Sequence, residues 1–350
     1  MKESTYQDSK NKSYTLKIRE IQKELPEFCG EYFRSLSNMN MSVLTRYGYA
    51  VDLRGFFRYL TEEIPLFSGS TPLSFTIDDL KKVTSNHIEL YLEYVSVYEK
   101  NDQEISNGEN GRARKLSAIR SFFKYYFKHQ YLESNVAALV ESPKLHEHAI
   151  IRLEPNEVAV LLDQAESGAN LTEKQRQFHK NTQLRDIAIL TLFLGTGIRI
   201  SELVGINVND IDFDNYAFTI TRKGGKQDIL SFGEEVAGAL RDYADQRKDM
   251  SPLEGHENAF FLSLQNRRIT VRAVENLVKK YASSAVPLKK ITPHKLRSTY
   301  GTMLYQESQD IYLVADVLGH KDVNTTRKHY AAQSRDNKRA AARMIRLRDD

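Results

Sequence analysis

The 350-residue sequence has little of what an extracellular or membrane-bound protein needs. Its single cysteine, Cys29, excludes a disulfide within the chain and suits a reducing compartment. The longest mostly apolar run, Ile187 to Leu194, is too short to cross a bilayer, and the polar first residues do not resemble a signal peptide. These absences predict a cytoplasmic protein that does not enter a membrane.

Motifs typical of metal enzymes are also absent. The sequence has no HExxH string, no pair of cysteines and no paired-carboxylate motif. The spacing of His294, His320 and His329 does not indicate a metal site either. We therefore expect no metal and no other cofactor.

The net charge says little about partners, because 50 basic and 46 acidic residues leave a formal charge of only +4. The distribution of charge is more informative. Residues 111–132 carry six lysines or arginines and no acid, and residues 335–348 carry six basic residues and one acid. These two basic segments are the candidates for contact with a nucleic acid.

The sequence pattern predicts two domains, residues 1–145 and residues 152–350. The stretch 141–151 holds a proline and several charges and is predicted to be the linker. In the first domain, apolar residues recur at helical spacing and no segment is typical of a strand, so we expect it to be all-helical.

The second domain is predicted to be helical with one exception. Residues 216–221 and 227–232 flank the turn Lys223-Gly224-Gly225-Lys226, which indicates a β-hairpin. Residues 172–183 are polar and are predicted to form an exposed loop, and the buried helix after them should stop at Gly195 and Gly197. The expected fold class is mainly α with a small β-sheet or hairpin.

A set of residues between positions 199 and 330 has the chemistry to hold and protonate a phosphodiester without a metal. Arginines and histidines stabilise negative charge on a transition state, a lysine can protonate a leaving oxygen, and a tyrosine can act as nucleophile. The members are Arg199, Lys223, His294, Arg297, His320 and Tyr330.

Local sequence supports two of these placements. Thr292 and Pro293 favour a helix start, which would put His294 and Arg297 in an opening turn, where a phosphate is favoured. Arg199 follows the break at Gly197, and Glu202 could orient its guanidinium.

Several candidates also have a plain structural alternative. Arg199 could form a weak surface pair with Glu202, and Lys223 could be a solubilising lysine of the hairpin turn. Arg297 could be a solvated arginine on a capped helix, and Tyr330 could be a core or interface tyrosine, one of the 19 in the chain. One reaction accounts for all six residues, whereas no single structural role does. His329 is interpreted as incidental.

The strings GTGIRISEL, ITRKGGKQD, TPHKLRST, VLGHKDV and TTRKHYAA, in this order, resemble those of the tyrosine recombinases, also called phage integrases. The likeness is greatest to Xer-type proteins that act as a single recombinase. The strings TRYGYAVDLRGFF and LSAIRSFF resemble, more loosely, the helical core-binding domain of the same family.

The resemblance implies a SAM-like helical core-binding domain in residues 1–145 and a catalytic domain with a C-terminal docking tail in residues 152–350. It implies these roles: phosphate binding for Arg199 and Arg297, general acid for Lys223, proton-transfer assistance for His294, completion of the phosphate pocket for His320, and nucleophile for Tyr330. Attack would leave a 3′-phosphotyrosine and a free 5′ hydroxyl. In many relatives the tyrosine falls nine residues after the second histidine, whereas here it falls ten after, and His329 occupies the ninth position.

The expected function is therefore site-specific recombination of double-stranded DNA. Two other readings stay open: a type IB topoisomerase-like nicking and closing enzyme, and a DNA-binding accessory factor without activity. The biological role, whether dimer resolution, integration and excision, or inversion, also stays open.

Contacts with DNA and between subunits are expected from the basic segments. The helix over residues 112–128 should bury a stripe of Leu116, Ile119, Phe123 and Phe127, and the alternative for its polar side is a solvated basic face. The residues expected to contact DNA are Arg112, Lys115, Arg120, Lys124 and Lys226. The tail after Tyr330 is expected to dock on the next subunit of a homo-tetramer on DNA through a short stripe that includes Met344 and Ile345, or else to rest on DNA as a frayed basic segment.

Overall fold

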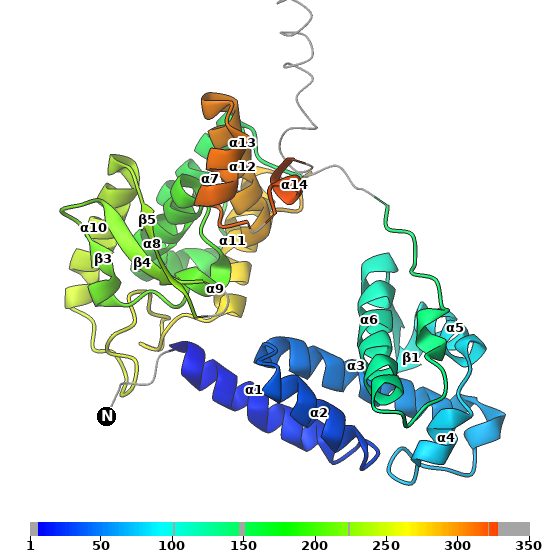
Figure 1. Ribbon diagram of the computed structural model, residues 1–350. Helices are drawn as coiled ribbons and strands as arrows, with labels where there is room; N and C mark the ends of the chain where they lie inside the picture. The colour runs from blue at the N-terminus through cyan, green and yellow to red at the C-terminus, as the bar shows by residue number, and fades with distance from the viewer. Residues whose placement is uncertain (1–5, 101, 147–150, 223–224, 321, 328–350) are drawn as a thin grey trace, which may run out of the picture. The chain divides into compact units, whose positions relative to one another are not determined.

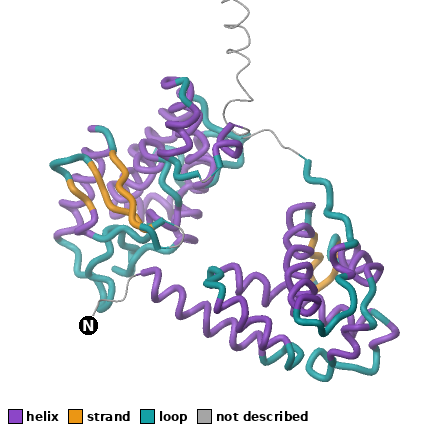
Figure 2. The backbone as a smooth tube through the Cα atoms, in the orientation of Figure 1, coloured by secondary structure: helices purple, strands orange, loops and turns teal. Residues whose placement is uncertain are grey.

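The computed structural model describes residues 6–100, 102–146, 151–222, 225–320 and 322–327 of the chain. The chain divides into two compact units, one up to residue 147 and one from residue 148 (Figure 1). Helices dominate both units, and the strands form two small antiparallel sheets (Figure 2).

The first unit is called here the helical unit. Its elements are α1 (Tyr6–Gln22), α2 (Cys29–Asn38), α3 (Val43–Glu63), η1 (Pro65–Phe67), α4 (Ile77–Lys81), α5 (Ser85–Tyr94), β1 (Val97–Lys100), β2 (Gln103–Ser106), α6 (Glu109–Lys128) and η2 (Val136–Ala138). Helices α1, α2, α5 and α6 pack against α3 around one hydrophobic core.

The prediction of no strand in this unit was wrong. β1 and β2 pair as an antiparallel hairpin, with Val97 opposite Ser106. The Asn107 side chain donates a hydrogen bond to the Val95 carbonyl at 2.7 Å and so helps to hold the hairpin at its base. These strands are short and mostly polar, so they lack the apolar alternation by which a strand is recognised.

Aromatic side chains of α3 and α6 meet in the core of the helical unit, which also includes buried residues of α1, α2 and α5. The rings of Phe57 and Phe122 meet edge to face with centroids 5.7 Å apart, the geometry that aromatic pairs prefer. The buried stripe of α6 runs through Leu116, Ile119, Phe122, Phe123 and Tyr126. Phe127, predicted to belong to this stripe, is instead 43% exposed, because it lies at the edge of a buried face that is centred on Ile119, Phe122 and Tyr126.

The second unit surrounds a long central helix, α8. Its elements are α7 (Pro155–Ser167), α8 (Glu173–Thr196), α9 (Ile200–Leu203), η3 (Val208–Asp210), β3 (Ile211–Asp212), β4 (Ala217–Thr221), β5 (Gln227–Ser231), α10 (Glu234–Lys248), α11 (Val271–Ala285), α12 (Pro293–Ser308), α13 (Ile311–Val317) and α14 (Val323–Thr326). Helices α7, α10 and α12 pack against α8, and the sheet has the order β3-β4-β5.

The predicted hairpin is present, but the predicted loop at residues 172–183 is wrong. Residues 173–183 form the first turns of α8, and the Thr172 and Gln175 side chains bond to each other's backbone N–H groups in a capping box. Polar residues that face solvent on the first half of a long helix look like a loop when they are read apart from the buried second half.

No helix among the described residues combines the length and the hydropathy that a membrane span requires.

Candidate active site

The break after α8 places Arg199. Gly197 caps α8 in the left-handed conformation, with φ of 61°, and its N–H donates to the Phe193 carbonyl. A Cβ atom on residue 197 would lie 2.4 Å from the Tyr300 ring and 2.8 Å from the Leu318 side chain. Only glycine fits this turn, which brings the chain to Arg199 at the start of α9.

Arg199 is held on two sides. Its Nη1 donates to Glu202 Oε1 at 2.9 Å, and its Nη2 donates to the carbonyl oxygens of Leu318 at 3.1 Å and Gly319 at 3.0 Å. The Glu202 side chain is only 3% exposed, so this is a buried carboxylate and not a weak surface pair. A third of the Arg199 side chain stays exposed, which leaves the guanidinium accessible from solvent.

Arg297 lies one turn into α12 and is buried, with 4% of its surface exposed. Its Nη1 donates to the Gly197 carbonyl and its Nη2 to the Leu318 carbonyl. The helix does start at Thr292 and Pro293, although the Thr292 side chain makes no capping hydrogen bond. His294 lies exposed in the first turn of the same helix, so the two residues differ in their surroundings.

His320 approaches Arg297 from the segment after α13. Its Nε2 lies 3.4 Å from Arg297 Nη2, and its Nδ1 lies 2.8 Å from Thr326 Oγ1. A guanidinium only donates, so Nε2 accepts in this contact and Nδ1–H donates to Thr326. Thr326, which is fully buried, thus fixes the ring and its tautomer.

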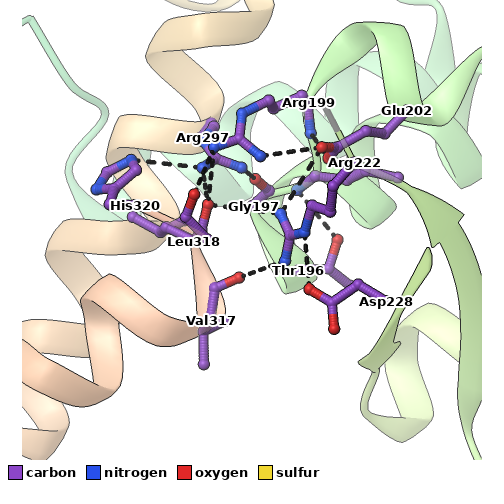
Figure 3. A network of polar contacts seen from close by, with 12 residues as sticks. Thr196, Gly197, Arg199, Glu202, Arg222, Asp228, Arg297, Val317, Leu318 and His320 are labelled. Carbon is purple, nitrogen blue, oxygen red and sulfur yellow. Dashed lines mark hydrogen bonds and ion pairs between the residues drawn. The ribbon is translucent and has the colours of Figure 1, made fainter. Parts of the chain in front are cut away.

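Sequence reasoning missed one member of this cluster, Arg222, which directly follows β4. Its Nε donates to Asp228 Oδ2 at 2.8 Å, and its Nη2 donates to the Val317 carbonyl at 3.2 Å (Figure 3). The hydrogen bond from Arg222 lowers the pKa of the Asp228 carboxyl from its ordinary value. A charged residue beside a predicted hairpin turn normally faces solvent, so no sequence signal distinguished it.

The cluster has an excess of positive charge. Arg199 and Arg222 pair with the two carboxylates of Glu202 and Asp228, and the third guanidinium, that of Arg297, donates to two carbonyls. The formal charges of these five described side chains sum to +1 with His320 neutral. N–H donors around such an excess suit an anion with several oxygens, such as a phosphodiester. Among the described residues, no group of acidic, histidine or cysteine side chains could hold a metal ion.

Two predicted site residues, Lys223 and Tyr330, lie outside the described residues. The structure brings together Arg199, Arg297 and His320, and it places Lys226 exposed at the end of the hairpin turn.

The predicted DNA-contacting residues of α6 differ in how they are engaged. The Lys115 side chain is 12% exposed, and its Nζ lies 3.5 Å from Asp52 Oδ1. Arg120 donates to the carbonyls of residues 137 and 140 and to the Ser142 hydroxyl. Lys124 is exposed, and Arg112 is partly buried with no hydrogen-bond partner for its Nε among the described residues.

Comparison with known proteins identifies the family. Residues 152–337 match the model of the phage integrase family. The chain is 35% identical to the tyrosine recombinase XerC of Caldanaerobacter subterraneus over 313 residues, which cover 86% of this chain and 81% of that protein. It is 29% identical to the tyrosine recombinase XerS of Streptococcus agalactiae, over 89% of this chain and 93% of that protein.

Solved structures show the same fold. The XerH site-specific recombinase bound to a palindromic difH substrate matches 87% of this chain and 80% of its own, with a TM-score of 0.64 and 18% identity. The Tn1549 transposon integrase in complex with a circular intermediate DNA matches 91% of this chain and 99% of its own, with a TM-score of 0.62 and 19% identity. The family match over residues 152–337 and the curated relatives together show that this chain belongs to the phage integrase family and is a tyrosine recombinase close to the Xer type.

Proposed function

We propose that this recombinase cuts and rejoins duplex DNA at a specific site through a covalent 3′-phosphotyrosyl intermediate. The observation that carries the proposal is the convergence of Arg199 and Arg297, from two different helices, beside His320 and with positive charge in excess. Such a pocket supplies preorganised donors where a phosphoryl transition state gathers negative charge.

In the proposed reaction the Tyr330 oxygen attacks the scissile phosphorus and the bond to the 5′ oxygen breaks. Lys223 gives a proton to that oxygen, and His294 assists proton transfer. Arg199 and Arg297 hold the non-bridging oxygens, and His320 completes the pocket. A 5′ hydroxyl from another strand then attacks the phosphotyrosine and releases Tyr330, so rejoining needs no external energy source.

The helical unit is proposed to bind the DNA arms, and its clearest candidate contact is Lys124. This lysine is exposed on α6, whereas Lys115 and Arg120 are already engaged within the unit. Lys226, exposed at the end of the β4–β5 turn, is a second candidate. Ammonium groups at such positions bind phosphates without reading sequence.

Assembly is proposed to follow from the tail. Residues 331–350 lie outside the described residues, and the proposal rests on their alternation of alanines, basic residues and a short apolar stripe. Docking on the next subunit of a tetramer would couple the tail to Tyr330. A chain ending at Ser334 should bind a half-site normally but load a full site less cooperatively, and normal cooperativity and recombination would exclude docking.

A plasmid assay tests the function. The binding site is first selected from random duplexes by the purified chain, and two copies are then placed on one supercoiled plasmid. Recombination predicts exchange products that depend on both sites. Relaxation without exchange would indicate a topoisomerase-like enzyme, and binding with neither outcome would indicate an accessory factor.

A further inference from the structure

The geometry points to Arg222 as a positioning residue that ties the β4–β5 turn to the end of α13, where Arg199 and Arg297 also bind. The inference rests on the proposed function, because it assumes that the turn delivers the general acid. It assigns Arg222 no contact with DNA.

Arg222 belongs to the turn through its backbone. Its N–H donates to the Lys226 carbonyl at 2.8 Å, and its carbonyl accepts from the Gly225 N–H at 3.1 Å. The residue therefore closes the turn that contains Lys223 in the sequence. Any movement of the turn as a body requires Arg222 to move as well.

The side chain of Arg222 ties this turn to the end of α13. Its Nη2 donates to the Val317 carbonyl at 3.2 Å, and its Nη1 lies 3.5 Å from the Leu318 carbonyl. The same Leu318 carbonyl accepts from Arg199 and Arg297. The Leu318 carbonyl oxygen thus lies next to Arg222 of the turn and also accepts from both proposed phosphate ligands.

The fit beside Gly319 strengthens this attachment. Gly319 has φ of 58°, and a Cβ atom there would lie 2.8 Å from Arg222 Cζ. The absence of a side chain lets the guanidinium pack directly against the backbone that precedes His320. Asp228, on the neighbouring strand β5, holds the guanidinium from the other side at 2.8 Å.

Two carboxylates lie beside Arg222. It makes an ion pair with Asp228, and its Nη1 lies 3.7 Å from Glu202 Oε1, so its charge is already compensated. A planar guanidinium can bridge the strand and the helix end at once, which a lysine ammonium cannot do.

The test compares two DNA substrates that differ in one atom. In the second substrate, sulfur replaces the leaving 5′ oxygen, and a thiolate departs without needing a proton. Arg222→Lys keeps the positive charge but loses the planar set of N–H donors that reaches Asp228 and the Val317 carbonyl at once. We expect it to slow cleavage of the ordinary substrate by about 10²-fold, because small misplacements of catalytic groups have effects of this size. The sulfur substrate should restore cleavage to near the wild-type rate.

Three other variants define the outcome. Lys223→Ala should show the same rescue, whereas Arg199→Ala should be slow on both substrates. Arg247→Lys is the matched control, because Arg247 also binds backbone carbonyls, those of residues 257, 259 and 260, away from the pocket. It should show no preference for the sulfur substrate.

Equal losses on both substrates for Arg222→Lys would overturn the inference and place Arg222 in the phosphate pocket. Should Arg222→Lys fail to fold, Asp228→Asn removes the other end of the anchor and should give a smaller loss with the same rescue. Absence of rescue in that variant would also overturn the inference. Failure of wild-type protein to cleave either substrate would instead refute the proposed function, and failure of rescue in Lys223→Ala would refute the acid role and the inference together.

Discussion

Arg199 and Arg297 donate hydrogen bonds to the same acceptor, the carbonyl oxygen of Leu318. The two arginines come from different helices, so this shared oxygen sets the distance between their guanidiniums. The C-terminal end of α13 carries partial negative charge, which favours cations at this position. The pocket is therefore assembled around a helix end before any DNA arrives.

Removing either arginine should separate catalysis from binding. We expect Arg199→Ala and Arg297→Ala each to slow cleavage by at least about 10²-fold, as does the loss of a preorganised oxyanion donor. Arg297→Ala should also lower the stability of the protein, because the substitution takes a hydrogen-bond donor away from the buried carbonyls of Gly197 and Leu318. Single-turnover cleavage, DNA affinity and thermal unfolding measure the three effects. Parallel losses of cleavage and affinity would mean that the arginines serve binding alone.

The nucleophile is tested by removing one oxygen atom. Tyr330→Phe should abolish the covalent protein–DNA adduct while DNA affinity and thermal stability stay close to wild type. Denaturing gels of a nicked substrate detect the adduct. His329→Phe is the control, because His329 precedes Tyr330 and falls at the spacing found in many relatives. Loss of adduct in the control alone would move the nucleophile assignment away from Tyr330.

Thr326 should act through His320. Thr326→Val keeps the shape of the side chain but removes the oxygen that accepts from Nδ1, so the ring loses its fixed orientation. We expect cleavage to slow by about 10-fold, in line with the loss of one hydrogen bond. Thr326→Ser keeps the hydroxyl and should recover most of the rate. A second substitution, His320→Ala, should remove the difference between threonine and valine, and additive effects would contradict the coupling.

The basic residues of α6 should fall into two classes. Lys124→Ala should make the slope of log affinity against log salt shallower by about 0.9, the value for one phosphate contact. Arg120→Ala should mainly lower stability, because Arg120 ties the segment at residues 137–142 to α6. Salt titrations of binding and urea denaturation measure the two effects. An unchanged slope in Lys124→Ala would place the DNA on another face.

Asp52 gives the helical unit a specific pH dependence. Burial raises the pKa of its carboxyl above the ordinary 3.8, against the attraction of Arg114 and Lys115. The folded protein thus holds this proton more tightly than the unfolded chain. That contribution to stability is present below the ordinary pKa and is lost as pH rises through the raised folded value. As the pH falls from about 7 to about 4, wild type should therefore gain stability relative to Asp52→Asn, as urea denaturation would show. A relative loss would mean that the two cations dominate.

The sequence predicted the helical character, the β4–β5 hairpin and the end of α8 at Gly197, because each has a local cause in apolar spacing or glycine. It did not predict the β1–β2 hairpin, whose strands are too polar for the pattern.

For the site, the sequence supplied the residue types but not their surroundings. Arg297 could have been a solvated side chain, but the ends of α8 and α13 meet it through the Gly197 and Leu318 carbonyls, and it is buried. Arg222 escaped notice because its role depends on the carbonyls of residues 317 and 318, which are distant in sequence and leave no local pattern. Thr326 is only six residues from His320, but the contact forms across the turn between α13 and α14, which no periodic spacing marks.

The two left-handed glycines at the pocket, Gly197 and Gly319, limit how the enzyme can be retargeted. Each stands where a methyl group would collide with a neighbour, the Tyr300 ring in one case and the Arg222 guanidinium in the other. In a mutant library that randomises the residues around Gly197 and Gly319, most variants would therefore be inactive. On the proposed function, diversity aimed at a new DNA target belongs on the exposed face of α6, around Lys124, with both glycines held constant.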